Sequence, residues 1–144
     1  FPVVPVPFYQ GKGVTHKEEG IGQPTRHSIS VDLTDERPPA LPPRTNIPSA
    51  FPREGAEALI ESERVTIWNY TWRTEQPVSL HFHDKDAVAV FVNQEPATLL
   101  FTGEDGSEER ITVSYKKVMF WPRDRVHTEE VVSGTPRAMI IELN

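Results

Sequence analysis

The residues best able to do chemistry are three histidines, two of them close together and one far along the chain. His81 and His83 are separated by one residue, and His127 follows 44 residues after His83 (127 − 83 = 44). On a β-strand the side chains of residues i and i+2 lie on the same face, so the two neighbouring imidazoles point the same way, with Cβ atoms about 7 Å apart. Two imidazoles placed like this can bind one metal ion, and imidazole suits zinc, iron, copper and nickel.

A His-x-His pair by itself is also compatible with two exposed imidazoles on a sheet. The residues that follow favour burial, because residues 87–92 (AVAVFV) are apolar on both faces of the expected strand. A buried polar side chain without a partner is unfavourable. Histidines that face inward here therefore need a partner, and a metal ion satisfies several of them at once.

The two histidine segments resemble the motifs of the cupin superfamily, whose members are small antiparallel β-barrels of the jelly-roll kind. The first cupin motif has His-x-His followed three or four residues later by Glu, and the second has Pro-x-Gly, two further residues and His. Here the first segment is residues 81–86 (HFHDKD) and the second is residues 122–127 (PRDRVH). The resemblance covers residues 52–144 and implies a small, single-domain, bacterial-type cupin.

The chain departs from this pattern where the acidic ligand of the family would fall. Ala87 and Val88 occupy those positions and cannot coordinate a metal, while Asp86 comes one residue early. Strict alternation sends Asp86 to the face opposite His83 unless the backbone bulges there. Asp86 is therefore a candidate ligand whose role depends on such a bulge. Asp124 replaces the glycine of the second motif, and aspartate tolerates the left-handed backbone better than most residues.

Two further residues are candidates for a catalytic role. Glu129 lies two residues after His127, so both share a strand face, where Glu129 would be a fourth ligand, a partner of a ligand or a general base. The alternative for Glu129 is a solvated side chain. Tyr70 shares a face with Trp68 and Trp72, and these three rings either line a cavity, where Tyr70 would offer its hydroxyl to a substrate, or pack in the core. Packing is favoured, because aromatic rings dominate ordinary cores.

The resemblance implies that His81, His83 and His127 hold one divalent metal ion, which would be iron, manganese, zinc or nickel. The metal would act as a Lewis acid or an oxygen-activating centre on a small oxygenated organic substrate. Dioxygenase, isomerase and decarboxylase activities are all implied, and a dioxygenase is favoured because a three-histidine set resembles that of some non-haem iron oxygenases of the superfamily. The alternative is a non-catalytic module that binds or senses a small ligand or a metal, and the missing motif glutamate favours this alternative.

The elements that must position these residues are short strands. The expected strands are rich in β-branched and aromatic residues and are separated by turn signals; they are residues 64–73, two pieces within 79–92, and residues 97–102, 109–113, 117–121, 128–132 and 138–143. Residues 55–63 fit either one helical turn or a short strand, and residues 103–106 (GEDG) fit a hairpin turn. Residues 50–144 therefore predict an all-β domain, a cupin-like double-stranded β-helix or jelly-roll barrel.

Residues 1–49 are expected to form an extended, proline-rich arm. Ten of the fourteen prolines lie at or before Pro52, and proline fixes φ and removes a backbone donor, which excludes a continuous helix or a central strand. Within the arm, residues 27–33 (HSISVDL) alternate as a half-buried strand does. The apolar opening of the arm indicates that it packs on the barrel or on a second subunit, so a homodimer is expected.

Composition narrows the classes of partner. The 144 residues include 15 Lys and Arg against 21 Asp and Glu, a net charge of −6, which argues against a nucleic-acid or anionic-membrane partner. No run of 18 apolar residues is present, and the absence of cysteine excludes disulfides and thiolate metal sites. The chain begins with Phe1 rather than Met, so it is expected to be either a fragment of a longer chain or a chain from which a preceding segment was removed. A cytoplasmic location and export to the periplasm both stay open.

Overall fold

The computed structural model describes residues 5–23 and 26–144. Nine β-strands form in this part of the chain, and all of them lie within residues 57–143; they are β1 (Glu57–Glu61), β2 (Val65–Thr71), β3 (Val78–Phe82), β4 (Ala87–Phe91), β5 (Ala97–Gly103), β6 (Glu108–Val113), β7 (Val118–Trp121), β8 (Val126–Ser133) and β9 (Arg137–Leu143). Each strand expected between residues 64 and 143 is present, with ends shifted by a few residues. Residues 55–63 take the strand alternative, as β1.

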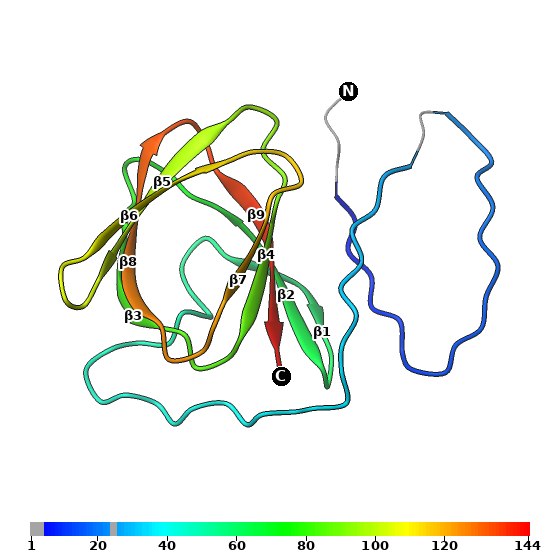
Figure 1. Cartoon of the computed structure of the whole chain (residues 1–144), viewed down its shortest axis with the longest axis horizontal. Helices are drawn as coiled ribbons and strands as arrows, with labels where there is room; N and C mark the ends of the chain where they lie inside the picture. Colours follow the sequence, from blue (N-terminus) through cyan, green and yellow to red (C-terminus); the bar gives the residue numbers. More distant parts are fainter. Residues whose placement is uncertain (1–4, 24–25) are drawn as a thin grey trace.

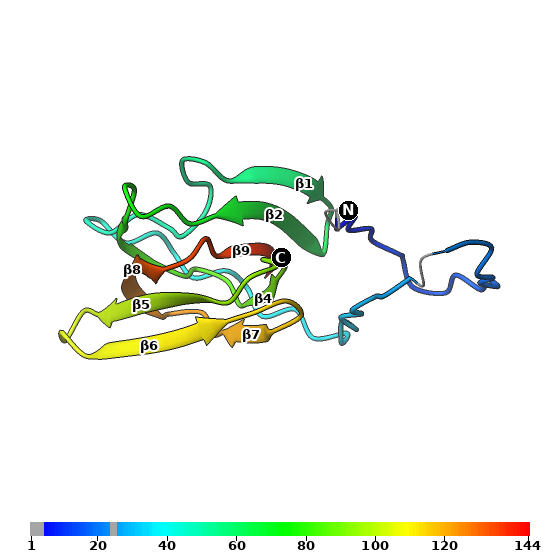
Figure 2. The same cartoon turned by 90° about the horizontal axis from the view of Figure 1, so that it is seen from above.

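The strands form two antiparallel sheets that face each other (Figures 1 and 2). One sheet has the order β1-β2-β9-β4-β7, and the other has the order β3-β8-β5-β6. Neighbours such as β4 and β9 are distant in sequence, which is the crossing connectivity of a jelly roll. The all-β class and the jelly-roll barrel expected from the sequence are therefore confirmed.

Strand alternation decides which residues enter the space between the sheets. In β4, Ala87, Ala89 and Phe91 are fully buried, while Val88 and Val90 between them are only partly buried. The inward residues join the aromatic core, in which Trp72 and Trp121 meet edge to face at 6.4 Å between ring centroids. A core of large aromatic rings with small alanines on the facing strands keeps the barrel interior filled next to the histidines.

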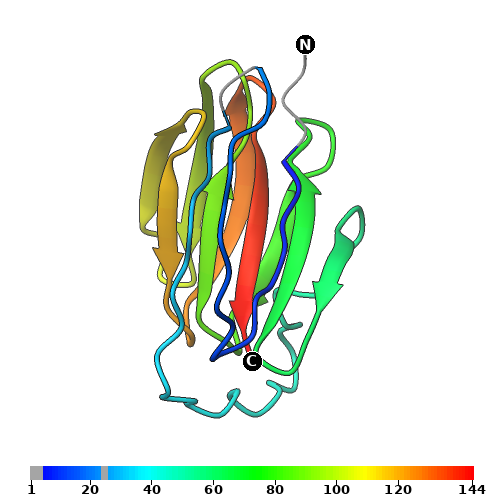
Figure 3. The ribbon, with the colours of Figure 1, turned by 90° about the vertical axis from the view of Figure 1, so that its right-hand side faces the viewer.

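The outer face of the five-stranded sheet carries a second apolar cluster. Val65, Ile67, Val92 and Met139 are buried there, and Leu33 of the arm packs against them. Figure 3 shows the early part of the arm running in front of this face. The strand expected at residues 27–33 does not form, because this segment pairs with no neighbouring strand, although Val31 and Leu33 are partly buried between exposed residues as the alternation indicated.

The later part of the arm runs along the end of the barrel at which β3 ends and β8 begins (Figure 1). The Leu41 amide donates to the carbonyl of Asp84 at 2.8 Å, and Ser49 forms an isolated parallel bridge with Phe82. Arg44 lies 2.5 Å from Asp124 Oδ1. These contacts attach the arm to the two loops that flank the histidine segments. Within residues 5–23 and 26–144, no helix is long and apolar enough to cross a membrane.

Candidate metal centre

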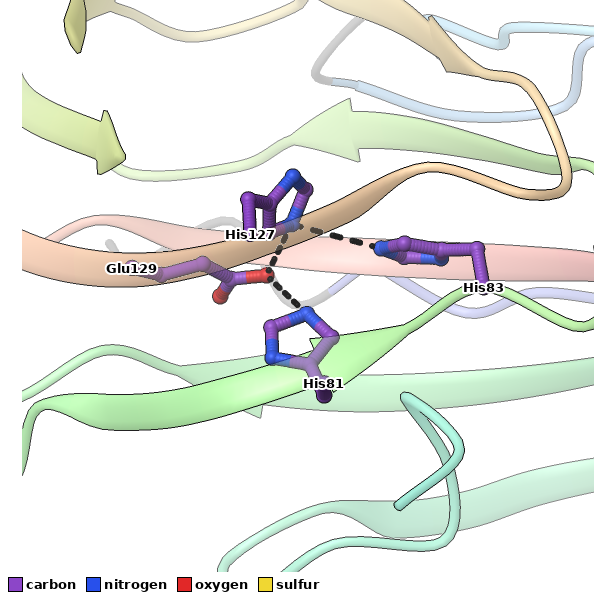
Figure 4. A group of neighbouring side chains, drawn as sticks. All are labelled: His81, His83, His127 and Glu129. Atoms are coloured by element: carbon purple, nitrogen blue, oxygen red, sulfur yellow. Dashed lines mark hydrogen bonds and ion pairs between the residues drawn. The ribbon is translucent and has the colours of Figure 1, made fainter. Parts of the chain in front are cut away.

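The structure brings His81, His83, His127 and Glu129 together inside the barrel (Figure 4). One donor atom from each lies within 4.8 Å of the others. His81 on β3 is the direct partner of His127 on β8, and Glu129 follows two residues later on the same face of β8. The convergence therefore follows from the register of two antiparallel neighbours, in which opposite side chains on one face are in contact.

His83 reaches the cluster from just beyond the end of β3. Its amide donates to the Arg125 carbonyl at 2.9 Å, and its own carbonyl accepts from the Asp124 amide at 2.7 Å. Asp124 has a φ of 72°, in the left-handed region where the second motif has glycine. The turn before β8 thus fixes His83 opposite His127 by backbone hydrogen bonds.

All four side chains are enclosed. His81 is 2% exposed, His83 and His127 are 1% exposed, and Glu129 is 0% exposed. The sequence favoured burial of these histidines over exposure on a sheet surface, and the structure shows them buried. Groups buried this deeply require partners for every polar atom.

The hydrogen-bonding pattern of His81 leaves one nitrogen without a proton to donate. Its Nδ1 lies 2.9 Å from the carbonyl of Ser79, and a carbonyl only accepts, so Nδ1 carries the proton. In the neutral ring, Nε2 then presents a lone pair, and it lies 3.2 Å from Oε1 of Glu129. Two lone pairs facing each other at that distance need a cation between them, either a proton or a metal ion.

His83 and His127 present the same difficulty. Their Nε2 atoms are 3.4 Å apart, and Nε2 of His127 is also 3.2 Å from Oε1 of Glu129. Burial, with smaller contributions from the nearby His127 and His81, lowers the pKa of His83 to about 3. Burial also lowers the pKa of His127, against the opposing effect of its hydrogen bond to Glu129. Protonation of His83 and His127 is therefore unfavourable in this enclosed site.

Glu129 is ionised despite its complete burial. Burial opposes ionisation, but the Arg53 guanidinium and the contacts of the carboxylate with the His127 and His81 rings together hold the pKa of Glu129 well below its ordinary value. Unprotonated imidazole nitrogens and an ionised carboxylate are the states in which these groups bind metals. The donor set of three nitrogens and one oxygen therefore fits a divalent ion such as iron, manganese, zinc or nickel.

Asp86 does not join the cluster. Its Oδ1 accepts a hydrogen bond from the Arg123 amide at 2.8 Å, and its carbonyl accepts from the Leu143 amide. Residues 83–86 form a bend between β3 and β4 rather than a strand, and Asp86 lies outside the group of possible ligands. Asp86 ties together the loop before β4 and the turn after β7, and Glu129 is the acidic group that reaches the histidines.

Tyr70 packs in the core against Trp72 and Arg53, the two residues that contact Glu129 Oε2. Its ring meets Trp72 edge to face at 4.9 Å and lies 4.1 Å below the guanidinium of Arg53. Burial raises the pKa of the Tyr70 hydroxyl. The packing alternative for this aromatic face is the one the structure supports.

Two residues in contact with Glu129 were not singled out from the sequence. Trp72 Nε1 donates to Glu129 Oε2 at 2.5 Å, and Arg53 Nη1 lies 3.1 Å from the same oxygen. The sequence suggested for Trp72 only that its ring lines a cavity or packs in the core, and Arg53 lies in an irregular segment where no periodicity predicts orientation. The signal that could have pointed to a cation was the buried glutamate itself, because an enclosed carboxylate requires compensation.

A cleft of about 750 Å³ opens beside the cluster and reaches His127. Phe101 and Arg125 form part of its wall, with the guanidinium of Arg125 lying 5.2 Å above the Phe101 ring. Arg44 of the arm lines the same cleft. Of the four clustered side chains, His127 is the one that lines this cleft.

Comparison with solved structures identifies the architecture. A cupin domain from Bordetella pertussis Tohama I matches with a TM-score of 0.54 at 20% sequence identity, over 70% of this chain and 99% of that domain. The chain has the cupin fold. A cupin superfamily protein from Desulfitobacterium hafniense matches at 23% identity over 75% of this chain and 98% of that protein, with a TM-score of 0.47. A cupin-2 domain protein from Shewanella frigidimarina matches at 18% identity over 65% and 83%, with a TM-score of 0.48.

A scan of protein families finds no match for this chain, and a search of curated proteins finds none either. The likeness in fold supports the cupin resemblance of residues 81–86 and 122–127. The chain departs from the cupin motif in the source of its acidic group: Ala87 and Val88 cannot supply it, and Glu129 on β8 lies among the histidines.

Proposed function

We propose that this cupin binds one divalent transition-metal ion through His81, His83, His127 and Glu129 and acts on a small oxygenated organic molecule. The observation that carries the proposal is the convergence of three imidazole Nε2 atoms and one carboxylate oxygen in an enclosed site. Neither protons nor hydrogen bonds among the four residues satisfy these atoms fully. When bound, the metal would supply Lewis acidity or oxygen activation.

The chain's own residues support a site for a small molecule next to the metal. The cleft that reaches His127 admits a molecule from solvent, and Phe101 offers an apolar wall. Four protein ligands leave further coordination positions open on a metal that takes five or six ligands, as non-haem iron does. Within this class we favour dioxygenase chemistry, because it uses a largely neutral histidine set with open positions, and isomerase chemistry is the next choice.

The first experiment is elemental analysis of the full chain, purified without an affinity tag. The expected result is about one equivalent of a transition metal, lost in His81→Ala and His127→Ala. Asp86→Asn serves as the matched control, because Asp86 lies outside the cluster, and it is expected to keep the metal. Protein that is folded but binds no added iron, manganese, zinc or nickel would contradict the proposal.

A second candidate is a non-catalytic module that binds or senses a metal or a small ligand. The full burial of the four side chains favours it, because closed sites more often serve structure than turnover. Oxygen uptake separates the two candidates. Metal-loaded protein would be tested against diketones, catechols and keto acids, and uptake that disappears in His83→Ala supports the enzyme. Stoichiometric metal without uptake or conversion of any of these compounds supports the binding module.

A further inference from the structure

The two oxygens of Glu129 have different neighbours. Oε1 lies 3.2 Å from Nε2 of both His81 and His127 (Figure 4). Oε2 accepts from Trp72 Nε1 and lies 3.1 Å from Arg53 Nη1. One oxygen therefore faces the histidines, and the other is held by a hydrogen bond from Trp72 and an ion pair with Arg53.

Arg53 is itself held tightly in one place. Its side chain is 10% exposed, and its guanidinium lies 4.1 Å from the Tyr70 ring and 4.5 Å from the Phe51 ring. Cation–π contacts of this kind fix a planar guanidinium between aromatic faces. Among the described residues, Glu129 is the carboxylate within ion-pair distance of Arg53.

The burial of Arg53 makes its pairing with Glu129 strongly favoured. Its Nε, Nη1 and Nη2 atoms are buried and have no hydrogen-bond partner among the described atoms, so its contact with Glu129 is an ion pair. A buried cation that lost its carboxylate would remain uncompensated, which is costly. The arginine and the glutamate therefore constrain each other.

We propose that Arg53, together with Trp72, is a positioning residue that holds Oε2 of Glu129 so that only Oε1 is offered to the metal. The proposal rests on the metal centre proposed above. The terminal torsion of a glutamate side chain is broad, so an unrestrained carboxylate could turn or bind through both oxygens. A hydrogen bond from Trp72 and an ion pair with Arg53, both on Oε2, remove that freedom and make the carboxylate a ligand through a single oxygen.

The orientation matters because it sets the number of ligands. A carboxylate bound through one oxygen leaves one more coordination position for a substrate than a carboxylate bound through two. Partners that orient metal ligands from behind are commonly worth 10–100-fold in metal affinity. Arg53 and Trp72 would thus tune both how tightly the metal is held and how many positions remain open.

The test uses Co²⁺ as the probe metal, bound to the full chain after metal removal and titrated in competition with a chelator. We expect Arg53→Met and Trp72→Phe each to weaken Co²⁺ affinity by about 10–100-fold and to change the visible d–d absorption, which reports coordination number. Trp68→Phe is the matched control, since Trp68 Nε1 donates to Glu142 Oε2 at 2.7 Å outside the cluster. Arg64→Met, which removes a bond to the Thr34 carbonyl, is the second control. Both controls are expected to stay within twofold of the parent with an unchanged spectrum.

The outcomes separate this inference from the proposed function. If the Arg53 and Trp72 variants bind Co²⁺ with the parent affinity and spectrum while His127→Ala does not bind, the metal centre stands and the positioning role is refuted. If the parent chain does not bind Co²⁺, both are refuted. Should Arg53→Met fail to fold, Arg53→Lys keeps the charge without the planar fork, and its expected spectrum lies between those of the parent and Trp72→Phe. A parent spectrum in both Arg53→Lys and Trp72→Phe would overturn the proposal.

Discussion

His81 and His127 lie opposite one another on β3 and β8, with ring centroids 4.7 Å apart and planes nearly perpendicular at 87°. Their Nε2 atoms converge on the same oxygen of Glu129. Antiparallel register alone places these two rings, and the turn that holds His83 completes the set. The centre is therefore as rigid as the hydrogen-bonded pair of strands that carries it.

Removing the metal is expected to lower the thermal stability of the protein. A ligand that binds only the folded state adds about 2.7 kcal/mol at a concentration 100 times its Kd. For a domain of this size that corresponds to a rise in Tm of roughly 5–10 °C. Calorimetry of the chelator-treated protein, before and after adding back each metal, measures the shift. An unchanged Tm in every case would contradict a metal site in the folded chain.

The metal-free protein is expected to lose stability as the pH falls from about 6.5 towards 3. The pKa of His83 is lowered to about 3 in the folded state, so over this range the unfolded chain binds more protons and acid favours unfolding. Glu129, whose pKa is also lowered, acts in the same direction below its ordinary value of 4.5. Urea unfolding at a series of pH values measures the slope, and His83→Gln is expected to flatten it. A slope equal in the parent and His83→Gln would argue against a buried neutral imidazole.

Replacing Asp86 is expected to affect stability and to leave the metal in place. Asp86→Ala removes a charged acceptor from the Arg123 amide, and such a bond contributes about 1.5–3 kcal/mol. Chemical denaturation should therefore show a loss of that order, while elemental analysis shows the parent metal content. Loss of metal from folded Asp86→Ala would restore Asp86 as a ligand.

The homodimer expected from the sequence stays a prediction, and the arm offers a way to test it. In the arm, Val6 is 79% exposed and Phe8 is 62% exposed. On the five-stranded sheet, Phe120 of β7 is 58% exposed. Apolar side chains exposed on both the arm and the sheet favour contact with a second copy. Sedimentation of the parent should show a dimer that Val6→Ser with Phe8→Ser weakens, whereas Glu19→Ser, also in the arm, should not. A parent that sediments as a monomer at high concentration would exclude it.

The histidine set could be predicted from the sequence because it depends on local rules. Period-two alternation places His81 with His83 and His127 with Glu129, and the apolar strand that follows indicates burial. Asp86 lies outside the cluster, in a bend between β3 and β4 where period-two alternation does not apply. The roles of Arg53 and Trp72 depend on how the two sheets pack, and no spacing along the chain encodes that. The segment 27–33 has the alternation of a strand, yet a strand also needs a neighbour to pair with, and alternation says nothing about neighbours.

The turn at residues 123–125 forms backbone hydrogen bonds with His83 and directly precedes β8, which carries His127. Asp124 of the same turn forms an ion pair with Arg44 of the arm. Half of the donor set, His127 and Glu129, therefore follows His83 by 44 residues or more (127 − 83 = 44). During synthesis on the ribosome, His81 and His83 are made before β4 to β8 and stay without these two partners until β8 pairs with β3. A metal ion held by all four residues would therefore bind only after β8 has been made and has taken its place in the sheet.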